Sequence, residues 1–291
     1  MSQTVFLNGR LMPIEQAYVP VLDRGFVFGD GVYEVIPVYS GRPFRLQEHL
    51  RRLDQSMAAI RLVNPYDEST WEKLITELLI PNMACSADYQ DISLYLQVTR
   101  GVAPRDHAFP RDATPTVFMM CSPMVMPSKA QCENGVAAIS TSDIRWDRCD
   151  IKAISLLPNV LLRQMSVDAG AVETVLFRDG ILTEGAVSNI FAVEDGVILA
   201  PPKDHHMLPG ITYDLILELA KANDMPLEIG YFEEARIRAA AELWTTSSAR
   251  EVLAITTLDE QPVGTGKPGP VFWRMHGIYQ EYKQRVMRSA G

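Results

Sequence analysis

The chain has 291 residues, 47% of them hydrophobic and 22% charged, and a formal net charge of −9. This length suits two modest domains, and the composition is ordinary for a globular protein. The acidic balance argues against nucleic acid or an anionic membrane surface as a partner. No apolar run approaches the roughly 20 residues of a membrane span, and the first residues lack the features of a secretory signal.

The cysteines and histidines indicate neither a disulfide framework nor a metal site. The four cysteines include no CxxC pair, so we expect a reduced, cytoplasmic protein. The five histidines show no HExxH or similar spacing. His205 and His206 are adjacent, and we expect their side chains to point apart on an extended chain. We therefore expect no metal.

Residues 1–120 predict a small N-terminal domain of mixed helices and strands. An Asn8-Gly9 turn between two short apolar runs predicts a hairpin. Further strands are expected at 32–39, 92–99 and 115–121, and helices at 46–62 and from Asp67 to a stop before Pro81. Two prolines and two serines within 122–128 then predict an interdomain linker at 121–128.

Residues 129–291 predict a larger C-terminal domain, again with both helices and strands. The turns Asp179-Gly180 and Asp195-Gly196 each separate two short apolar strands. Helices are expected from Ile211 to about Ala222 and from Val271 to Arg288. Because ligand sites favour domain junctions, we expect one where the two domains meet.

Lys152 is one of only seven lysines, against twenty arginines, and a mostly apolar run, 153–157, follows it. A buried ammonium group is costly unless it is paired or neutralised. The lysine could extend its charged head into water near a helix start. It could instead be a desolvated amine that attacks a carbonyl to form a Schiff base. The residue alone does not decide between the two.

Two stretches could bind an anion. Residues 208–212 place a glycine and a threonine where a helix begins, so that free amide groups could hold a phosphate. Residues 245–249 form a hydroxyl-rich turn, which could bind an anion or simply cap the backbone. Arg52 would add positive charge to such a site. Glu184 could face the pyridine nitrogen of a bound cofactor and keep it protonated. Either residue could equally be an ordinary surface residue.

Over nearly its whole length the sequence resembles the fold-type IV pyridoxal-phosphate (PLP) aminotransferases. Each block that carries the resemblance is weak alone, but together and in this order they are specific. The blocks are Asp23 to Glu34, His49-Leu50-Arg51-Arg52-Leu53, Lys152 with Leu156-Leu157-Pro158-Asn159, Thr183-Glu184-Gly185 with Ser188-Asn189-Ile190-Phe191, and Leu208-Pro209-Gly210-Ile211-Thr212.

The resemblance implies an α+β fold with a small N-terminal α/β domain, a larger C-terminal α/β domain and PLP in the cleft between them. Lys152 would hold PLP as a Schiff base and then shuttle the proton. Glu184 would pair with the pyridine nitrogen. The phosphate would be bound by Arg52, the backbone of Ile211 and Thr212, and Ser248 with the Ala249 amide.

Residues 97–107 look like the segment that binds the substrate α-carboxylate in the D-amino acid aminotransferases of this family. Arg105, His107 and Tyr33 occupy the binding positions, and a guanidinium suits a carboxylate. The resemblance implies ping-pong transamination of D-amino acids, such as D-alanine or D-glutamate, with 2-oxoglutarate or pyruvate as the 2-oxo acid acceptor. It also implies a homodimer in which Arg105 and His107 reach the partner's site.

Three alternatives remain: a branched-chain L-amino acid aminotransferase, an aminodeoxychorismate lyase and a non-catalytic PLP carrier. Two departures from the pattern leave the side-chain preference open. Ala186-Val187 stands where D-specific members often have serines, and Arg250 stands where a small residue is common. Arg250 could reach a substrate side-chain carboxylate or point to solvent.

Overall fold

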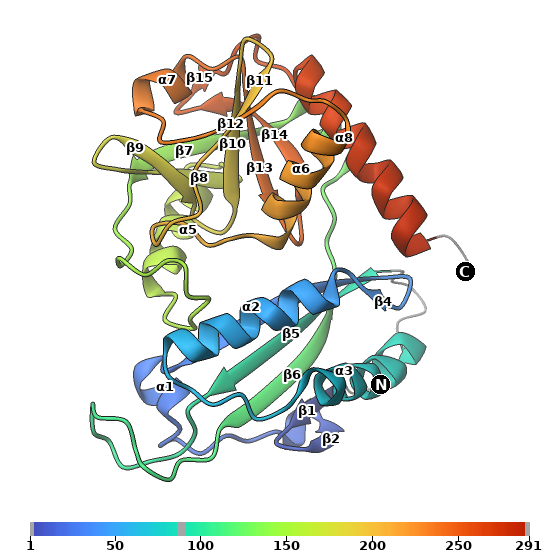
Figure 1. Cartoon of the computed structure of the whole chain (residues 1–291), viewed down its shortest axis with the longest axis vertical. Helices are drawn as coiled ribbons and strands as arrows, with labels where there is room; N and C mark the ends of the chain where they lie inside the picture. Colours follow the sequence, from blue (N-terminus) through green and yellow to red (C-terminus); the bar gives the residue numbers. More distant parts are fainter. Residues whose placement is uncertain (1–2, 86–90, 289–291) are drawn as a thin grey trace. The chain divides into compact units, whose positions relative to one another are not determined.

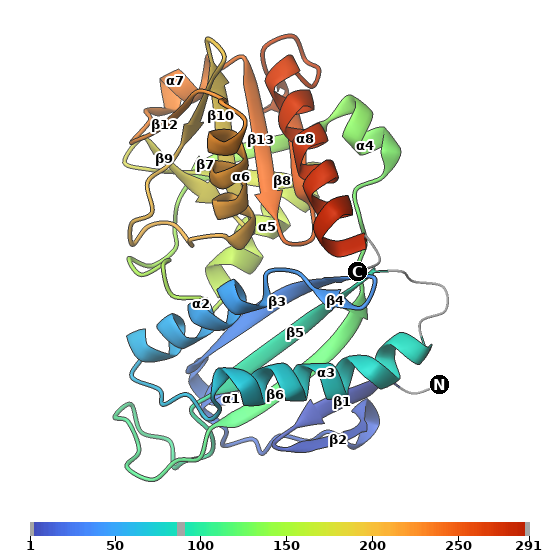
Figure 2. The same cartoon turned by 45° about the vertical axis from the view of Figure 1, so that its right-hand side comes forward.

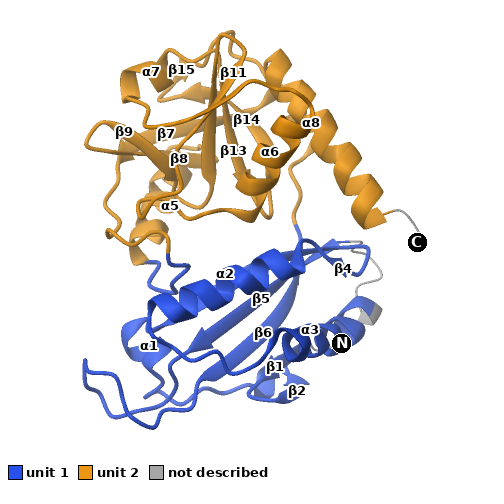
Figure 3. Ribbon diagram, viewed as in Figure 1, with its two compact units in different colours: residues 1–124, 151–156 blue, residues 125–150, 157–291 orange. Residues whose placement is uncertain are grey.

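The computed structural model describes residues 3–85 and 91–288, which form two compact units (Figure 3). Unit 1 comprises residues 1–124 and 151–156, and unit 2 comprises residues 125–150 and 157–291. Both units mix helices and strands, which confirms the predicted α+β class. The division differs from the predicted 1–120, 121–128 and 129–291, because a short segment of the second half belongs to unit 1.

Unit 1 is an antiparallel sheet with two long helices. Its elements are β1 (Thr4–Leu7), β2 (Arg10–Pro13), a 3-10 turn (Ile14–Gln16), α1 (Arg24–Phe28), β3 (Gly31–Tyr39), β4 (Arg42–Pro43), α2 (Leu46–Ala59), α3 (Glu68–Cys85), β5 (Asp91–Thr99) and β6 (Thr116–Pro123). The strand order is β2-β1-β6-β5-β3-β4. The predicted hairpin, strands and first helix are confirmed, but the start of the predicted linker is instead the end of β6.

Helices α2 and α3 pack on the sheet of unit 1 and enclose its core (Figure 2). Strand β5 shows the alternation expected of a half-buried strand, with every second side chain in the core. From α2, Leu53 and Met57 meet this face, and from α3, Trp71 and Ile75 do so. The apolar periodicity of the sequence therefore corresponds to one core.

Helix α3 continues through Pro81, so the predicted stop before this proline was wrong. Proline removes one helical hydrogen bond and crowds the preceding turn. Here the helix is anchored around it, because Leu78 and Leu79 are buried. The Asn82 amide also donates to the carbonyl oxygens of Leu78 and Thr4, each at 2.9 Å. The buried leucines and the bond to Thr4 are tertiary contacts, and together with the bond to Leu78 they help to offset the lost bond.

Segment 151–156 belongs to unit 1 because its backbone pairs with the start of β3. The Tyr33 N–H donates to the Lys152 carbonyl at 3.0 Å, and the Ile154 N–H donates to the Gly31 carbonyl at 3.1 Å. These bonds join stretches that are far apart in the sequence. They fix the backbone of Lys152 against the sheet of unit 1.

Unit 2 is built on a larger, mixed sheet. Its elements are α4 (Lys129–Asn134), β7 (Val136–Ser142), α5 (Leu157–Asp168), β8 (Glu173–Arg178), β9 (Ile181–Gly185), β10 (Asn189–Glu194), β11 (Val197–Ala200), α6 (Ile211–Ala222), β12 (Leu227–Ile229), α7 (Glu234–Arg238), β13 (Glu242–Ser247), β14 (Glu251–Leu258), β15 (Gln261–Pro262) and α8 (Pro270–Lys283). The strand order is β12-β11-β10-β13-β14-β7-β8-β9, and β15 pairs with β14.

The strands predicted around both Asp-Gly turns and the predicted helix at Ile211–Ala222 are confirmed in unit 2. The predicted last helix is divided, because α8 ends at Lys283 and a π-helical turn follows at Gln284–Arg288. Helices α6 and α8 pack on β13 (Figure 1). Among the described residues, no helix is long and apolar enough to cross a membrane.

Candidate active site

Lys152 is held beside an aromatic ring in unit 1. Its backbone N–H donates to the Ser56 hydroxyl at 3.2 Å, in addition to the pairing with β3. Its Nζ lies 4.2 Å from the centroid of the Tyr33 ring, a distance at which the ring face attracts a cation. The predicted buried apolar setting is only partly present, because Ile151 is buried but Lys152 is half-buried and Leu157 is exposed.

Arg52 lies in a buried ion-pair cluster formed by α2 and β3. Its Nε and Nη2 donate to the two carboxylate oxygens of Glu34 at 2.8 and 2.7 Å. The Nδ1 of His49 lies 2.8 Å from the same carboxylate. Burial opposes ionisation of Glu34, but Arg52 and His49 hold its pKa well below the usual range. Burial lowers the pKa of His49, which favours the neutral imidazole.

Arg105 and His107 are exposed, and both lie against Phe28 of α1. The guanidinium carbon of Arg105 is 5.4 Å from the Phe28 ring centroid, and the His107 and Phe28 rings are 5.4 Å apart. In the described part of unit 1, no hydrogen bond or ring contact joins either residue to Tyr33 or Lys152. Tyr33 thus lies beside Lys152, whereas Arg105 and His107 lie against Phe28.

Glu184 is a buried carboxylate of unit 2, with 4% of its surface exposed, rather than an exposed strand end. Its Oε1 accepts a hydrogen bond from Arg145 Nη1 and one from the Leu208 N–H, the latter at 3.2 Å. Its Oε2 accepts one from Asn189 Nδ2 at 3.2 Å. Burial raises the pKa of Glu184 to about 7, and Arg145 opposes this rise.

Arg145 is absent from the residues predicted from the sequence, although it binds Glu184 directly. Its Nε and Nη2 donate to the two oxygens of Asp143 at 2.9 and 2.8 Å. Burial works against the charge of Arg145, but Glu184 and Asp143 hold its pKa above the usual range. The only signal in the sequence is an acidic and a basic residue two positions apart, and such pairs are common on protein surfaces.

The start of α6 is held beside this buried carboxylate. The Asn189 amide donates to the Leu208 carbonyl at 3.0 Å, so the stretch before the helix is fixed at both backbone groups of Leu208. Gly210 is the N-cap, and a Cβ there would lie 2.1 Å from Asn189 Oδ1. Ile211 and Thr212 begin the helix, where amide groups lack helical acceptors and the dipole is positive.

The second predicted phosphate-binding stretch begins within β13, so only its end, from Ser248, is a turn. Thr246 and Asn189 are cross-strand partners in β13 and β10, which places their side chains on one face. Thr246 Oγ1 is buried and has no hydrogen-bond partner within residues 3–85 and 91–288. Ser248 and Ala249 follow directly. An unpartnered buried hydroxyl suits a polar ligand.

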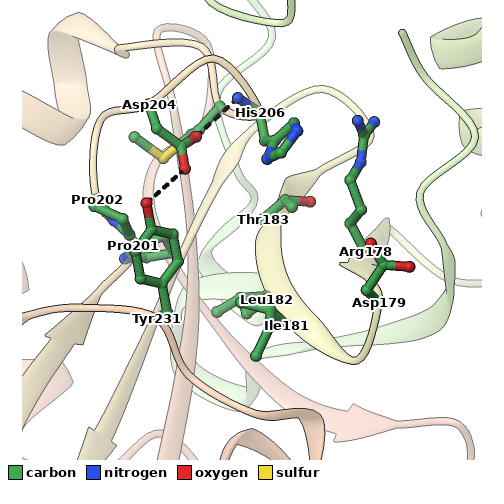
Figure 4. Close-up of a pocket in the computed structure, with 11 residues that line it drawn as sticks. Arg178, Asp179, Ile181, Leu182, Thr183, Pro201, Pro202, Asp204, His206 and Tyr231 are labelled. Carbon is green, nitrogen blue, oxygen red and sulfur yellow. Dashed lines mark hydrogen bonds between the residues drawn. The ribbon is translucent and has the colours of Figure 1, made fainter. Parts of the chain in front are cut away.

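A cavity of about 190 Å³ in unit 2 contains none of the predicted cofactor residues (Figure 4). It is lined by Thr183, whereas Glu184, the next residue along β9, is not among its lining residues, because successive side chains alternate across a strand. On another wall, the Tyr231 hydroxyl donates to Asp204 at 3.1 Å. This cavity is therefore separate from the residues around Glu184.

His205 and His206 do not point apart as expected from an extended chain. They lie in a turn, and their ring centroids are 4.0 Å apart. Even so, among the residues that the structure describes, no group of three or more histidine, cysteine, aspartate or glutamate side chains could hold a metal ion.

The chain is similar to known proteins in both sequence and structure. The amino-transferase class IV family model matches residues 31–258. The D-alanine aminotransferase of Bacillus licheniformis is 41% identical over 267 residues, 92% of each chain. That of Staphylococcus haemolyticus is 36% identical over 278 residues, 96% of this chain and 97% of the relative.

Among solved structures, a T.th. branched-chain amino acid aminotransferase with pyridoxamine 5'-phosphate matches with a TM-score of 0.89 and 26% identity. The match covers 97% of this chain and 94% of that one. The predicted resemblance to the fold-type IV aminotransferases is confirmed by these similarities.

Proposed function

We propose, from the premise that the chain belongs to the amino-transferase class IV family, that it transfers the amino group of D-amino acids to a 2-oxo acid. The chain is a PLP-dependent aminotransferase of this class. The similarity to D-alanine aminotransferases, 41% over 92% of both chains, carries the choice of D-amino acids such as D-alanine or D-glutamate. The branched-chain neighbour, at 26% identity, favours the alternative of an L-specific enzyme.

The chemistry of the predicted residues fits PLP. The buried Glu184 carboxylate suits a protonated pyridine nitrogen, and the start of α6 with the Ser248–Ala249 turn suits a phosphate. Lys152 supplies a primary amine, and Arg52 supplies a positive charge within the buried cluster with Glu34. When bound, the cofactor withdraws electrons from the Cα of the amino donor, which makes the α-proton removable.

In this proposal Lys152 carries the proton to and from Cα, and its fixed backbone keeps the amine in place. Glu184 keeps the ring nitrogen protonated as long as its own carboxylate is ionised. That carboxylate is only partly ionised near neutral pH, because burial raises its pKa to about 7 even with Arg145 beside it. Arg145 favours the ionised form.

Tyr33, Arg105 and His107 would bind the donor carboxylate. In one chain, Arg105 and His107 lie against Phe28, and among the described residues neither makes a hydrogen bond or ring contact with Tyr33. By resemblance to the family, these two residues would complete the site of a second copy in a homodimer. The cytoplasmic location and the position of PLP in a cleft between domains stay predictions.

The test is a donor screen with both enantiomers of alanine, glutamate, leucine and valine, and with 2-oxoglutarate or pyruvate as acceptor. We expect D-alanine or D-glutamate to be turned over fastest. Preference for L-leucine or L-valine over every D-amino acid would overturn the D-specific assignment. It would leave the family membership unchanged.

A further inference from the structure

Arg250 follows neither of the two interpretations that the sequence left open. Its Nη1 donates to Glu173 Oε2 at 2.7 Å, and its backbone N–H donates to the Ser247 hydroxyl at 3.2 Å. Glu173 is fully buried, whereas 21% of the Arg250 side chain is exposed. The guanidinium is therefore directed inward, to a carboxylate of β8.

Glu173 also holds the turn that follows β9. Its Oε2 accepts a hydrogen bond from the Ser188 hydroxyl at 2.7 Å, and its Oε1 accepts one from the Ala186 N–H at 3.1 Å. This turn is tightly packed, because a Cβ on Gly185 would lie 2.4 Å from Ser188 Oγ. One buried carboxylate thus connects the 185–188 turn to Arg250.

The two turns are also joined through β13. The Thr245 hydroxyl donates to Ser188 Oγ at 2.7 Å. Ser248 and Ala249, the predicted phosphate-binding pair, lie between Ser247 and Arg250, and the backbone of Arg250 is bonded back to Ser247. The conformation of this pair therefore depends on where the Arg250 side chain is anchored.

A cation is needed at this anchor. Burying an ionised carboxylate costs free energy when only neutral groups donate hydrogen bonds to it. An ion pair with a cation reduces this cost. Within residues 3–85 and 91–288, the only ion pair made by Glu173 is the one with Arg250. Loss of Arg250 should loosen both turns, because their common carboxylate would then be buried without an opposite charge.

We propose that Arg250 is a positioning residue for the Ser248–Ala249 turn and not a receptor for the side-chain carboxylate of the substrate. The proposal rests on the proposed function only in that Ser248 and Ala249 bind the PLP phosphate. It follows that donors with an acidic side chain gain no selective binding from Arg250.

The test measures PLP binding to the apoprotein by absorbance titration, so that it needs no substrate. Arg250→Ala should raise the Kd for PLP about tenfold or more, because PLP binding must then order the Ser248–Ala249 turn without the charge-assisted bond that now holds it. Arg250→Lys should recover most of the affinity, because only one guanidinium nitrogen contacts Glu173 and an ammonium can replace it. Arg236→Ala is the control, since Arg236 pairs with Glu194 and Glu228 on the surface and should leave the Kd unchanged.

The KM values for D-glutamate and D-alanine, measured with saturating PLP, separate positioning from substrate binding. Their ratio should be the same in Arg250→Ala and in the parent. A selective rise for D-glutamate, or a parent-like Kd for PLP in Arg250→Ala, would overturn the proposal. If the parent uses only L-amino acids, the proposed function has failed. The KM comparison is then made with L-glutamate and L-leucine in place of D-glutamate and D-alanine.

A second variant keeps the proposal testable if Arg250→Ala does not fold. Glu173→Gln combined with Arg250→Met removes both charges and leaves no unpaired carboxylate. We expect it to fold and still to bind PLP about tenfold more weakly, because the link between the turns is lost. Parent-like PLP binding by this double variant would refute the positioning role.

Discussion

Arg52→Ala should destabilise the protein itself and not only weaken cofactor binding. The sequence placed Arg52 at the phosphate, where its loss would reduce PLP retention. In the structure, two of its nitrogens donate to the fully buried Glu34 at 2.8 and 2.7 Å. Its removal leaves this carboxylate with His49, whose lowered pKa favours the neutral form.

Removing one partner of a buried ion pair typically costs about 3–5 kcal/mol. In proteins somewhat smaller than this one, a loss of 1 kcal/mol lowers Tm by about 2–4 °C. The Arg52→Ala apoprotein should therefore melt roughly 6–20 °C below the parent apoprotein. Glu34→Gln in the same chain removes the unpaired charge, so the double variant should recover much of this difference. Arg52→Lys keeps the charge but not the two-pronged geometry, and it should fall between parent and alanine variant.

The assay is thermal unfolding of the apoprotein, followed by circular dichroism, with a separate PLP titration of each variant. The apoprotein is essential because bound ligand adds stability through mass action. An Arg52→Ala apoprotein that melts within about 2 °C of the parent would refute the argument. It would mean that the Glu34 carboxylate finds other donors at no cost.

Four further outcomes are expected. Borohydride should fix PLP to the peptide that contains Lys152; labelling of another lysine would contradict this. Glu184→Gln should slow α-proton removal by roughly 10²–10³-fold while keeping much of the PLP, and an unchanged rate would show a structural role only. The pKa of Glu184 is raised from 4.5 to about 7, so the folded protein binds this proton more tightly than the unfolded chain does. The resulting stabilisation of the apoprotein is complete below about pH 4.5 and is lost as the pH rises through 7. Chemical unfolding from pH 4.5 to 8 should show this loss, about 3 kcal/mol, relative to Glu184→Gln, and parallel curves would contradict it. Arg105→Ala should raise KM for D-alanine steeply while a donor amine without a carboxylate is little affected; equal effects on both donors would argue against a carboxylate contact.

The identity of the family was readable from the sequence because it depends on short local motifs and their order. Local signals also predicted most elements. The Asn8-Gly9 pair predicted the hairpin, and the strand predicted at 92–99 is β5. The helix predicted from Ile211 is α6, and its N-cap is Gly210, where a Cβ would collide with Asn189.

The order of residues in the chain could not predict features that depend on distant neighbours. Helix α3 passes Pro81 because Asn82 reaches the carbonyl of Thr4 in another element. Segment 151–156 joins unit 1 because its backbone pairs with the start of β3. Neither bond has a local signature, since backbone groups are the same in every residue.

The charged partners of the site were likewise decided by tertiary structure alone. The sequence supplied Glu184 as a carboxylate and Arg250 as a cation, each with an ordinary surface residue as the alternative. Folding buries Glu184 against Arg145 and directs Arg250 to Glu173. A charge can remain in the interior only where an opposite charge or several donors meet it, and those partners come from other strands and loops. The sequence by itself therefore determined which chemical groups are present, and the packing of distant segments determined which of them are paired.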